Sequence, residues 1–334
     1  MSTAFVLGQK NLTYDPAGLV ALYESYPAVR DSYAQAADWS GHQVQDLLHK
    51  RADDKGLSLV TSVGLTAAML GIADVLAEQG VLPGTVGGLS LGALTAAAVA
   101  GALPRREVVR LLCDTDASDV PESPEHPEGC VAAVLPLGQS VEGFYGTRPG
   151  VWFSGDFGMH VSGAFRMVLL SGHREALDRL AAEHPPEYFV FSEEPIAVHS
   201  PLRHRARDIT ARLTAGIEFG DPAVPLCSSL EERTLFTGAE VRSMVARNVV
   251  EPVHTDRLAR EMRRQGARLG LVLGPTLPRD AFEFPFPVVH IEAPEDVAAA
   301  VAAVTEHGGG TVTGQTATTA QSADSPQTEG RTRA

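Results

Sequence analysis

A glycine–serine–glycine pattern, Gly88-x-Ser90-x-Gly92, constrains this chain more than any other stretch. It follows the short run Thr85-Val86 and precedes a helix of small residues that we expect over residues 91–100. This order is typical of a nucleophile elbow, a tight strand-to-helix turn that exposes a serine hydroxyl. Glycine is required on both sides of the serine because the turn leaves no room for side chains. The pattern also arises by chance, so the rest of the chain must support it.

Composition limits the class of protein. The chain has 334 residues, a hydrophobic content of 44% and a net charge of −14. This length suits one large or two modest domains, and the negative charge argues against nucleic acid as the main partner. The first residues lack the features of a signal peptide, and the apolar segment 62–80 contains two acidic residues, so we expect no membrane span. The three cysteines show neither metal-binding nor pairing spacing, which favours a reduced, cytoplasmic setting.

The order of apolar and polar segments predicts an α/β fold with a small insert. Strands and helices alternate in residues 1–127 and 195–310, which predicts a large α/β-hydrolase-like subdomain with a parallel sheet. Residues 128–194 hold four expected strands and a helix, which suggests a small ferredoxin-like α+β subdomain. We expect the tail, residues 311–334, to be disordered because it has almost no large apolar residue.

A serine nucleophile needs a base, and His199 is the best-placed histidine. It follows the apolar run Ile196-Ala197-Val198 and precedes Ser200-Pro201, so it would lie at a strand end and face a cleft. Several other histidines lie in polar segments, where they are expected to be solvated. Composition alone leaves the catalytic role of His199 open.

Six short segments, in order between residues 4 and 300, are similar to the motifs of one family. They are Phe5-Val6-Leu7-Gly8-Gln9, Gly88-Leu89-Ser90-Leu91-Gly92, Gly172-His173-Arg174-Glu175-Ala176-Leu177, Ile196-Ala197-Val198-His199-Ser200-Pro201-Leu202, Arg247-Asn248-Val249-Val250-Glu251-Pro252-Val253 and Leu271-Val272-Leu273-Gly274-Pro275. Through them the chain resembles the malonyl-CoA:acyl-carrier-protein transacylase family, which includes the acyltransferase domains of polyketide synthases. Together the six are far more specific than any one of them.

The resemblance implies a mechanism for the expected serine and histidine. Ser90 would attack a thioester carbonyl, with His199 as general base and then general acid. Backbone N–H groups of Gln9 and Leu91 would hold the oxyanion. A backbone or side-chain carbonyl near Asn248 would orient the histidine, and a helix C-cap is the equally weighted alternative for Asn248.

Departures from the family pattern bear on the acyl group. Malonyl-type members carry an arginine that pairs with the free carboxylate, and Thr115 stands at that position here. Leu89 replaces the histidine before the serine, Val198 belongs to an unusually apolar segment, and the shortened opening motif has Lys10 in place of a glycine. We therefore expect Leu89, Thr115 and Val198 to line an acyl pocket without a fixed positive charge. Such a pocket favours a neutral, bulky acyl group over a carboxylate.

The predicted function is that of an acyltransferase in polyketide or related secondary metabolism, such as antibiotic biosynthesis. Its substrates would be acyl-CoA or acyl-carrier-protein thioesters, its partner an acyl carrier protein, and no metal or bound organic cofactor is expected. One alternative is a thioesterase that uses the same serine and histidine to hydrolyse acyl-carrier-protein thioesters. The other is a non-catalytic protein that docks on the carrier protein.

A basic cluster that includes Arg203, Arg205 and Arg207 begins four residues after the expected base. Carrier proteins of this kind are usually acidic, so the cluster, with Arg166 or Arg174 of the insert, is a candidate docking surface. The alternative interpretation is a solvated helix face, which is at least as common for any single arginine.

Overall fold

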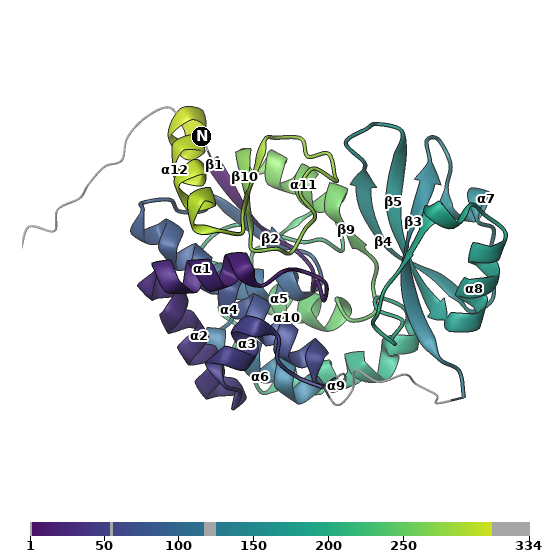
Figure 1. Ribbon diagram of the computed structural model, residues 1–334, viewed down its shortest axis with the longest axis horizontal. Coiled ribbons are helices and arrows are strands. Elements are labelled where there is room, and N and C mark those ends of the chain that lie inside the picture. The colour runs from purple at the N-terminus through teal and green to yellow at the C-terminus, as the bar shows by residue number, and fades with distance from the viewer. Residues whose placement is uncertain (1, 54–55, 117–124, 309–334) are drawn as a thin grey trace, which may run out of the picture.

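Two β-sheets form the framework of the protein, and they occupy different halves of the molecule in Figure 1. The computed structural model describes residues 2–53, 56–116 and 125–308. The predicted fold class, an α/β chain with a large and a small ferredoxin-like subdomain, is confirmed. The expected disordered tail, 311–334, lies outside the described residues, and the exact domain boundaries stay a prediction.

The large sheet has six strands in the order β11-β10-β1-β2-β7-β8. Its strands are β1 (Ser2–Leu7), β2 (Thr85–Gly88), β7 (Leu226–Cys227), β8 (Thr234–Leu235), β10 (Ala267–Leu273) and β11 (Val288–Ile291). All neighbouring strands are parallel except β7 and β8. The central strand β1 is buried from Thr3 to Leu7 and apolar from Ala4 onward, as expected of a parallel strand that is covered on both faces. Parallel strands also bring their carboxyl ends to one edge, where β1 and β2 run into the loops of the site.

Ten helices among the described residues surround this sheet (Figure 1). They are α1 (Ala17–Ser25), α2 (Pro27–Ser40), α3 (Val44–His49), α4 (Leu57–Glu78), α5 (Leu91–Val99), α6 (Arg105–Asp116), α9 (His204–Ala215), α10 (Gly238–Arg247), α11 (Thr255–Arg264) and α12 (Pro294–Gly308). Helix α4 is long and apolar enough to cross a membrane, but 89% of its most apolar window is buried inside the protein. It is thus typical of the core helix of a soluble protein.

The small sheet has five strands in the order β6-β3-β5-β4-β9. Its elements are β3 (Glu128–Pro136), α7 (Val141–Phe144), β4 (Val151–Met159), β5 (Phe165–His173), α8 (Arg174–Ala182), β6 (Phe189–Phe191) and β9 (Val253–His254). The first four strands are antiparallel and, with α7 and α8, follow the βαββαβ order of a ferredoxin-like unit. Strand β9 comes from outside the expected insert and pairs in parallel with β4, so the two subdomains share a ladder.

Candidate active site

The turn between β2 and α5 has the geometry of a nucleophile elbow. Ser90 occupies it with φ 53° and ψ −115°, a strained conformation for a residue with a side chain. A Cβ atom added at Gly92 would lie 2.1 Å from the carbonyl oxygen of Leu7, and one at Gly88 would lie 2.2 Å from that of Gly92. Backbone therefore fills the space on both sides of the serine, which is why the sequence has glycine there.

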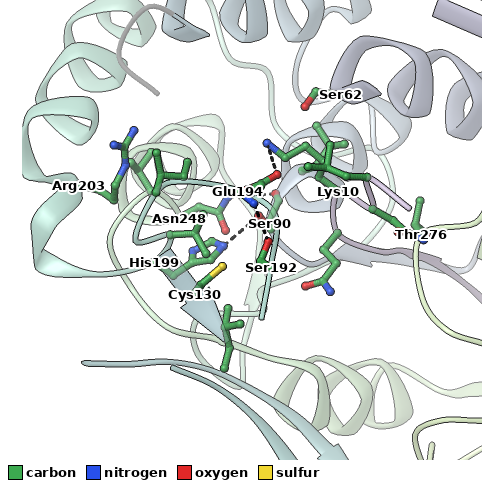
Figure 2. A pocket seen from close by; sticks show the side chains of 18 of the residues that line it. Lys10, Ser62, Ser90, Cys130, Ser192, Glu194, His199, Arg203, Asn248 and Thr276 are labelled. Carbon is green, nitrogen blue, oxygen red and sulfur yellow. Dashed lines mark hydrogen bonds and ion pairs between the residues drawn. The ribbon is translucent and has the colours of Figure 1, made fainter. Parts of the chain in front are cut away.

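His199 lies beside this serine, although it is distant in the sequence. Its Nε2 atom is 2.9 Å from the Oγ atom of Ser90 (Figure 2). The backbone of His199 also has a positive φ, 50°, and its residue is 6% exposed. The chain reaches it directly from the small subdomain, through the segment that follows β6. A serine and a histidine that share a hydrogen bond in a strained, sheltered setting form the arrangement expected of a nucleophile and its base.

The environment keeps this histidine neutral. Burial lowers the pKa of His199 to about 4, and the backbone carbonyl groups of Asn248 and Glu251 act in the opposite direction. The Nδ1 atom is buried and has no hydrogen-bond partner among the described residues. At neutral pH the ring therefore has a free lone pair, and with the proton on Nδ1 it can accept the serine proton at Nε2.

Asn248 holds the elbow as well as ending a helix. It is the C-cap of α10, and its Nδ2 atom donates a hydrogen bond of 3.0 Å to the backbone oxygen of Ser90. Its Oδ1 atom has no hydrogen-bond partner in the described part of the chain. The side chain thus contacts the nucleophile's backbone, and only its backbone carbonyl acts on the ring of His199. An orienting role for Asn248 stays a prediction.

The two expected oxyanion donors differ in the structure. Leu91 is the first residue of α5, where N–H groups lack partners inside the helix, and it lines the cavity beside Ser90. The N–H group of Gln9 instead donates to the backbone oxygen of Thr276 at 3.1 Å. The expectation that Gln9 offers its N–H to substrate is therefore wrong for this structure, because the loop at Thr276 packs directly on the end of β1.

A cavity of about 720 Å³ opens at the serine, and we call it the Ser90 cavity. Thr115 and Val198 line it as expected, and the Thr115 hydroxyl donates to the backbone oxygen of Leu111 at 2.6 Å. The expected role of Leu89 is wrong, because its side chain is 0% exposed and belongs to the core of the large subdomain. Leu89 lies in the bend after β2, and its N–H group donates to the backbone oxygen of Leu7 at 2.9 Å, which holds the residue against the end of β1.

Two cations also line the Ser90 cavity, which corrects the expectation of a pocket without fixed positive charge. The Nζ atom of Lys10 lies 2.7 Å from the Oε1 atom of Glu194. Arg203 is 3% exposed, and it is not a free charge. In Figure 2 its guanidinium group extends away from Ser90 and His199. The pairing of Lys10 with Glu194 could not be predicted from the sequence, because it depends on two loops that are far apart in the chain.

The candidate docking arginines differ in their exposure and in their partners. Arg203 is buried, so it is unsuited to contact a partner protein directly. Arg205 and Arg207 on α9 are exposed, and Arg207 pairs with Asp208 at 2.7 Å. On the insert, Arg174 pairs with Asp178 at 2.9 Å. Only the exposed members of the cluster remain candidates for docking.

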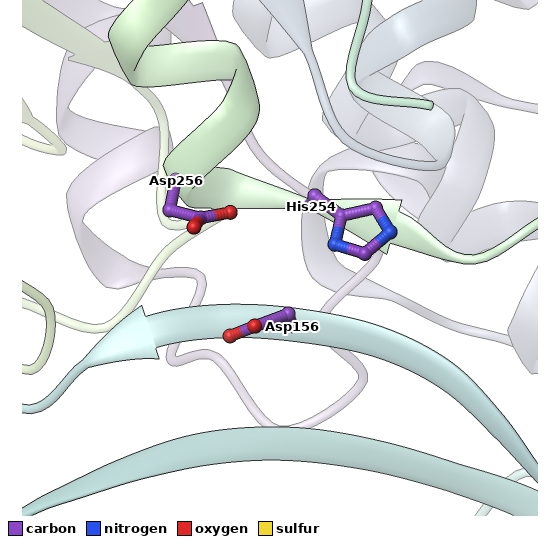
Figure 3. A group of neighbouring side chains, drawn as sticks. All are labelled: Asp156, His254 and Asp256. Atoms are coloured by element: carbon purple, nitrogen blue, oxygen red, sulfur yellow. The ribbon is translucent and has the colours of Figure 1, made fainter. Parts of the chain in front are cut away.

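A second charged group lies where the two subdomains share their ladder. Asp156 of β4, His254 of β9 and Asp256 of α11 gather there (Figure 3), and their ligand atoms are close enough to hold a metal ion. Arg166 of β5 donates to the carboxylate of Asp156 and lies 3.4 Å from that of Asp256. We call these four residues the junction cluster. The guanidinium group already compensates both carboxylates, so the cluster has the character of a structural contact.

The sequence matches known acyltransferases. The profile of the acyl transferase domain matches residues 19–275. The malonyl CoA-acyl carrier protein transacylase of Escherichia coli strain K12 is 25% identical over 293 residues, which cover 81% of this chain and 88% of that protein. A non-reducing polyketide synthase of Menisporopsis theobromae is 27% identical over 248 residues, which cover 70% of this chain and 11% of that much longer protein.

Solved structures share the fold. A malonyl-transacylase in complex with the acyl-carrier protein of a type II polyketide synthase has a TM-score of 0.78 and 20% identity, with 91% of this chain and 100% of that chain covered. The malonyl-CoA:acyl carrier protein transacylase of Xanthomonas oryzae pv. oryzae has a TM-score of 0.77 and 20% identity, with 90% and 98% covered.

Proposed function

The chain belongs to the malonyl-CoA:acyl-carrier-protein transacylase family of acyltransferases, and we propose that it works through an acyl-enzyme on Ser90. The observation that supports this most is the 2.9 Å contact between the Ser90 hydroxyl and the Nε2 atom of His199. Both residues line a cavity of about 720 Å³, which is large enough for an acyl chain.

The proposed reaction has two halves that use the same residues. His199 takes the proton of Ser90 while the oxygen attacks the thioester carbonyl, and the N–H group of Leu91 stabilises the oxyanion. Collapse of the intermediate breaks the carbon–sulfur bond, and the leaving thiol takes the proton from His199. An acceptor thiol then gives its proton to the histidine and attacks the serine ester, which restores the free hydroxyl. The buried neutral ring suits both steps because it enters each as a base.

The acyl group that fits this cavity best is neutral. Thr115 stands where malonyl-type members have an arginine, and its hydroxyl is already bonded within its own helix. Lys10 is paired with Glu194, and Arg203 is also engaged. Much of the remaining wall is apolar: it includes Leu94, Leu111, Leu112, Phe157, Leu169 and Ile196. A carboxylate that entered without a cation would lose several kcal/mol of hydration.

The proposed partner is an acyl carrier protein, as in the complex formed by one of the structural neighbours. Exposed Arg205 and Arg207, on the helix that follows the histidine, are suited to an acidic partner. The similarity to a polyketide synthase supports a place in secondary metabolism.

Intact-protein mass spectrometry tests this function. We expect the wild type to gain one acyl mass from butyryl- or pentanoyl-CoA and to pass it to a carrier protein. Ser90→Ala should lose acylation by roughly 10⁴-fold or more, whereas Ser162→Ala, in an exposed turn, should behave as wild type. Unchanged acylation of Ser90→Ala would overturn the proposal. Free acid released without a carrier protein would indicate a thioesterase, and carrier binding without any acylation a docking protein.

A further inference from the structure

We propose that Glu194 determines acyl specificity by occupying Lys10, so that carboxylated acyl groups are disfavoured in the Ser90 cavity. This inference rests on the proposed acyl-enzyme at Ser90. It assigns a role to Lys10, which replaces a glycine of the opening motif, and to Glu194, which lies in none of the six motifs. The substrates that the pair excludes are the ω-carboxyacyl thioesters.

The pair is sheltered and lines the same cavity as the reacting serine and histidine. Both residues line the same cavity as Ser90, and the Lys10 Nζ atom lies 2.7 Å from the Glu194 Oε1 atom (Figure 2). The two side chains are only 15% and 12% exposed. Bulk water therefore screens their charges weakly, and any third charge in the cavity interacts strongly with them.

Both partners are held by segments that lead to the catalytic residues. Lys10 follows Gln9 at the end of β1, and its Nζ atom also donates to the Oγ atom of Ser58 at 2.7 Å. Glu194 lies in the segment between β6 and His199, and its own N–H group donates to Ser192 Oγ at 3.1 Å. The charges are thus fixed in place before a substrate arrives, as a specificity element requires.

A carboxylated acyl group would meet this pair in one of two unfavourable ways. If it took Lys10 for itself, Glu194 would remain as a sheltered carboxylate without its cation. If it left the pair intact, it would lie near a like charge without a partner of its own. A neutral acyl group disturbs neither charge. The pair therefore disfavours carboxylated acyl groups because their binding leaves one carboxylate without a cation.

Removal of the carboxylate should reverse this preference. In Glu194→Gln the side chain keeps its shape but no longer neutralises Lys10, which becomes available to a substrate carboxylate. The probes are malonyl- and succinyl-CoA, each compared with the neutral butyryl- and pentanoyl-CoA. The readout is the initial rate of acyl-enzyme formation on Ser90, by intact-protein mass spectrometry.

We expect Glu194→Gln to raise the rate ratio of acidic to neutral acyl groups about tenfold or more. The double variant Lys10→Met/Glu194→Gln should lose this gain, because the cation is absent. Glu187→Gln, the same change in an exposed residue that does not line the Ser90 cavity, should leave the ratio at the wild-type value.

Three results would overturn the inference. A wild-type ratio in Glu194→Gln would do so, as would a gain that persists in the double variant. An equal loss for all four thioesters, with a lowered melting temperature, would show that the pair only ties two loops together. If instead the wild type forms no ester on Ser90 with any thioester, the proposed function itself fails, and the inference with it.

Discussion

The two subdomains meet at two charged contacts that look alike but are built differently. In the Ser90 cavity, Lys10 and Glu194 lie on loops. In the junction cluster, Arg166 lies between Asp156 and Asp256 on strands and a helix. The ladder between β4 and β9 fixes the position of the second contact, and the registered pair Asp156 and His254 belongs to that ladder.

The difference is in what surrounds the charges. The junction cluster is packed between regular elements, so its ion pairs can only hold those elements together. The Lys10–Glu194 pair borders a cavity of about 720 Å³, so a substrate can compete for either partner. The comparison teaches that an ion pair contributes to stability where it is enclosed by secondary structure, and to selectivity where it borders a cavity.

The largest expected effect tests whether acylation depends on the residues of the Ser90 cavity and not on the junction cluster. His199→Asn should lower the rate of Ser90 acylation by roughly 10³-fold or more, because the general base is lost. Asparagine tolerates the positive φ at this position, so the fold should be retained. Quenched time courses of acylation with butyryl-CoA measure the rate, and circular dichroism checks the fold. A rate within tenfold of wild type would contradict the assignment of the base.

An intermediate effect tests the junction cluster. Arg166→Met should lower the free energy of unfolding by about 1–3 kcal/mol, because the half-buried carboxylate of Asp156 loses its partner, whereas Asp256 keeps Arg260 at 2.9 Å. The acylation rate per folded molecule should stay within about twofold of wild type, since Arg166 does not line the Ser90 cavity. Urea titration and the acylation assay measure the two quantities.

The matched control for the junction cluster is Asp156→Asn combined with Arg166→Met, which should regain part of the lost stability. If Arg166→Met were as stable as wild type but acylated slowly, the contrast between the two contacts would be wrong.

The smallest expected effect concerns the exposed arginines of α9, which are the candidates for docking the carrier protein. Arg207→Glu should raise the KM for an acidic carrier protein about three- to tenfold, more at low salt, and leave acylation by CoA thioesters unchanged. Arg212→Glu, which lies about 140° around the same helix, is the control and should change the KM little. An unchanged KM for Arg207→Glu at low salt would remove this helix from the docking surface.

Local signals made much of the fold and part of the site predictable. The glycines around Ser90 are required because backbone atoms of nearby residues and of the end of β1 fill the space beside them. Their spacing in the sequence therefore predicts the turn. His199 follows an apolar run that brings it back from the small subdomain to the sheet edge. The alternation of antiparallel strands with α8 was likewise readable along the chain.

Features that depend on distant partners could not be predicted. The N–H group of Gln9 is used by a loop near the other end of the chain, at Thr276. Strand β9 has only two residues, too few for a pattern of its own, yet it joins the sheets. The prediction for Leu89 was wrong because the burial of this residue depends on its contact with Leu7, which is far from it in the sequence. The Lys10–Glu194 pair needs the assembled tertiary structure.

Ser90 and His199 share a backbone property that reaches beyond catalysis. Both hold φ angles that glycine adopts freely, and each such departure costs of the order of 1–3 kcal/mol. Replacement of either residue by glycine would relax the backbone and, under the proposed mechanism, abolish activity. Selection for thermal stability alone would therefore favour glycine at these two positions. Serine and histidine are retained there only while selection also acts on activity.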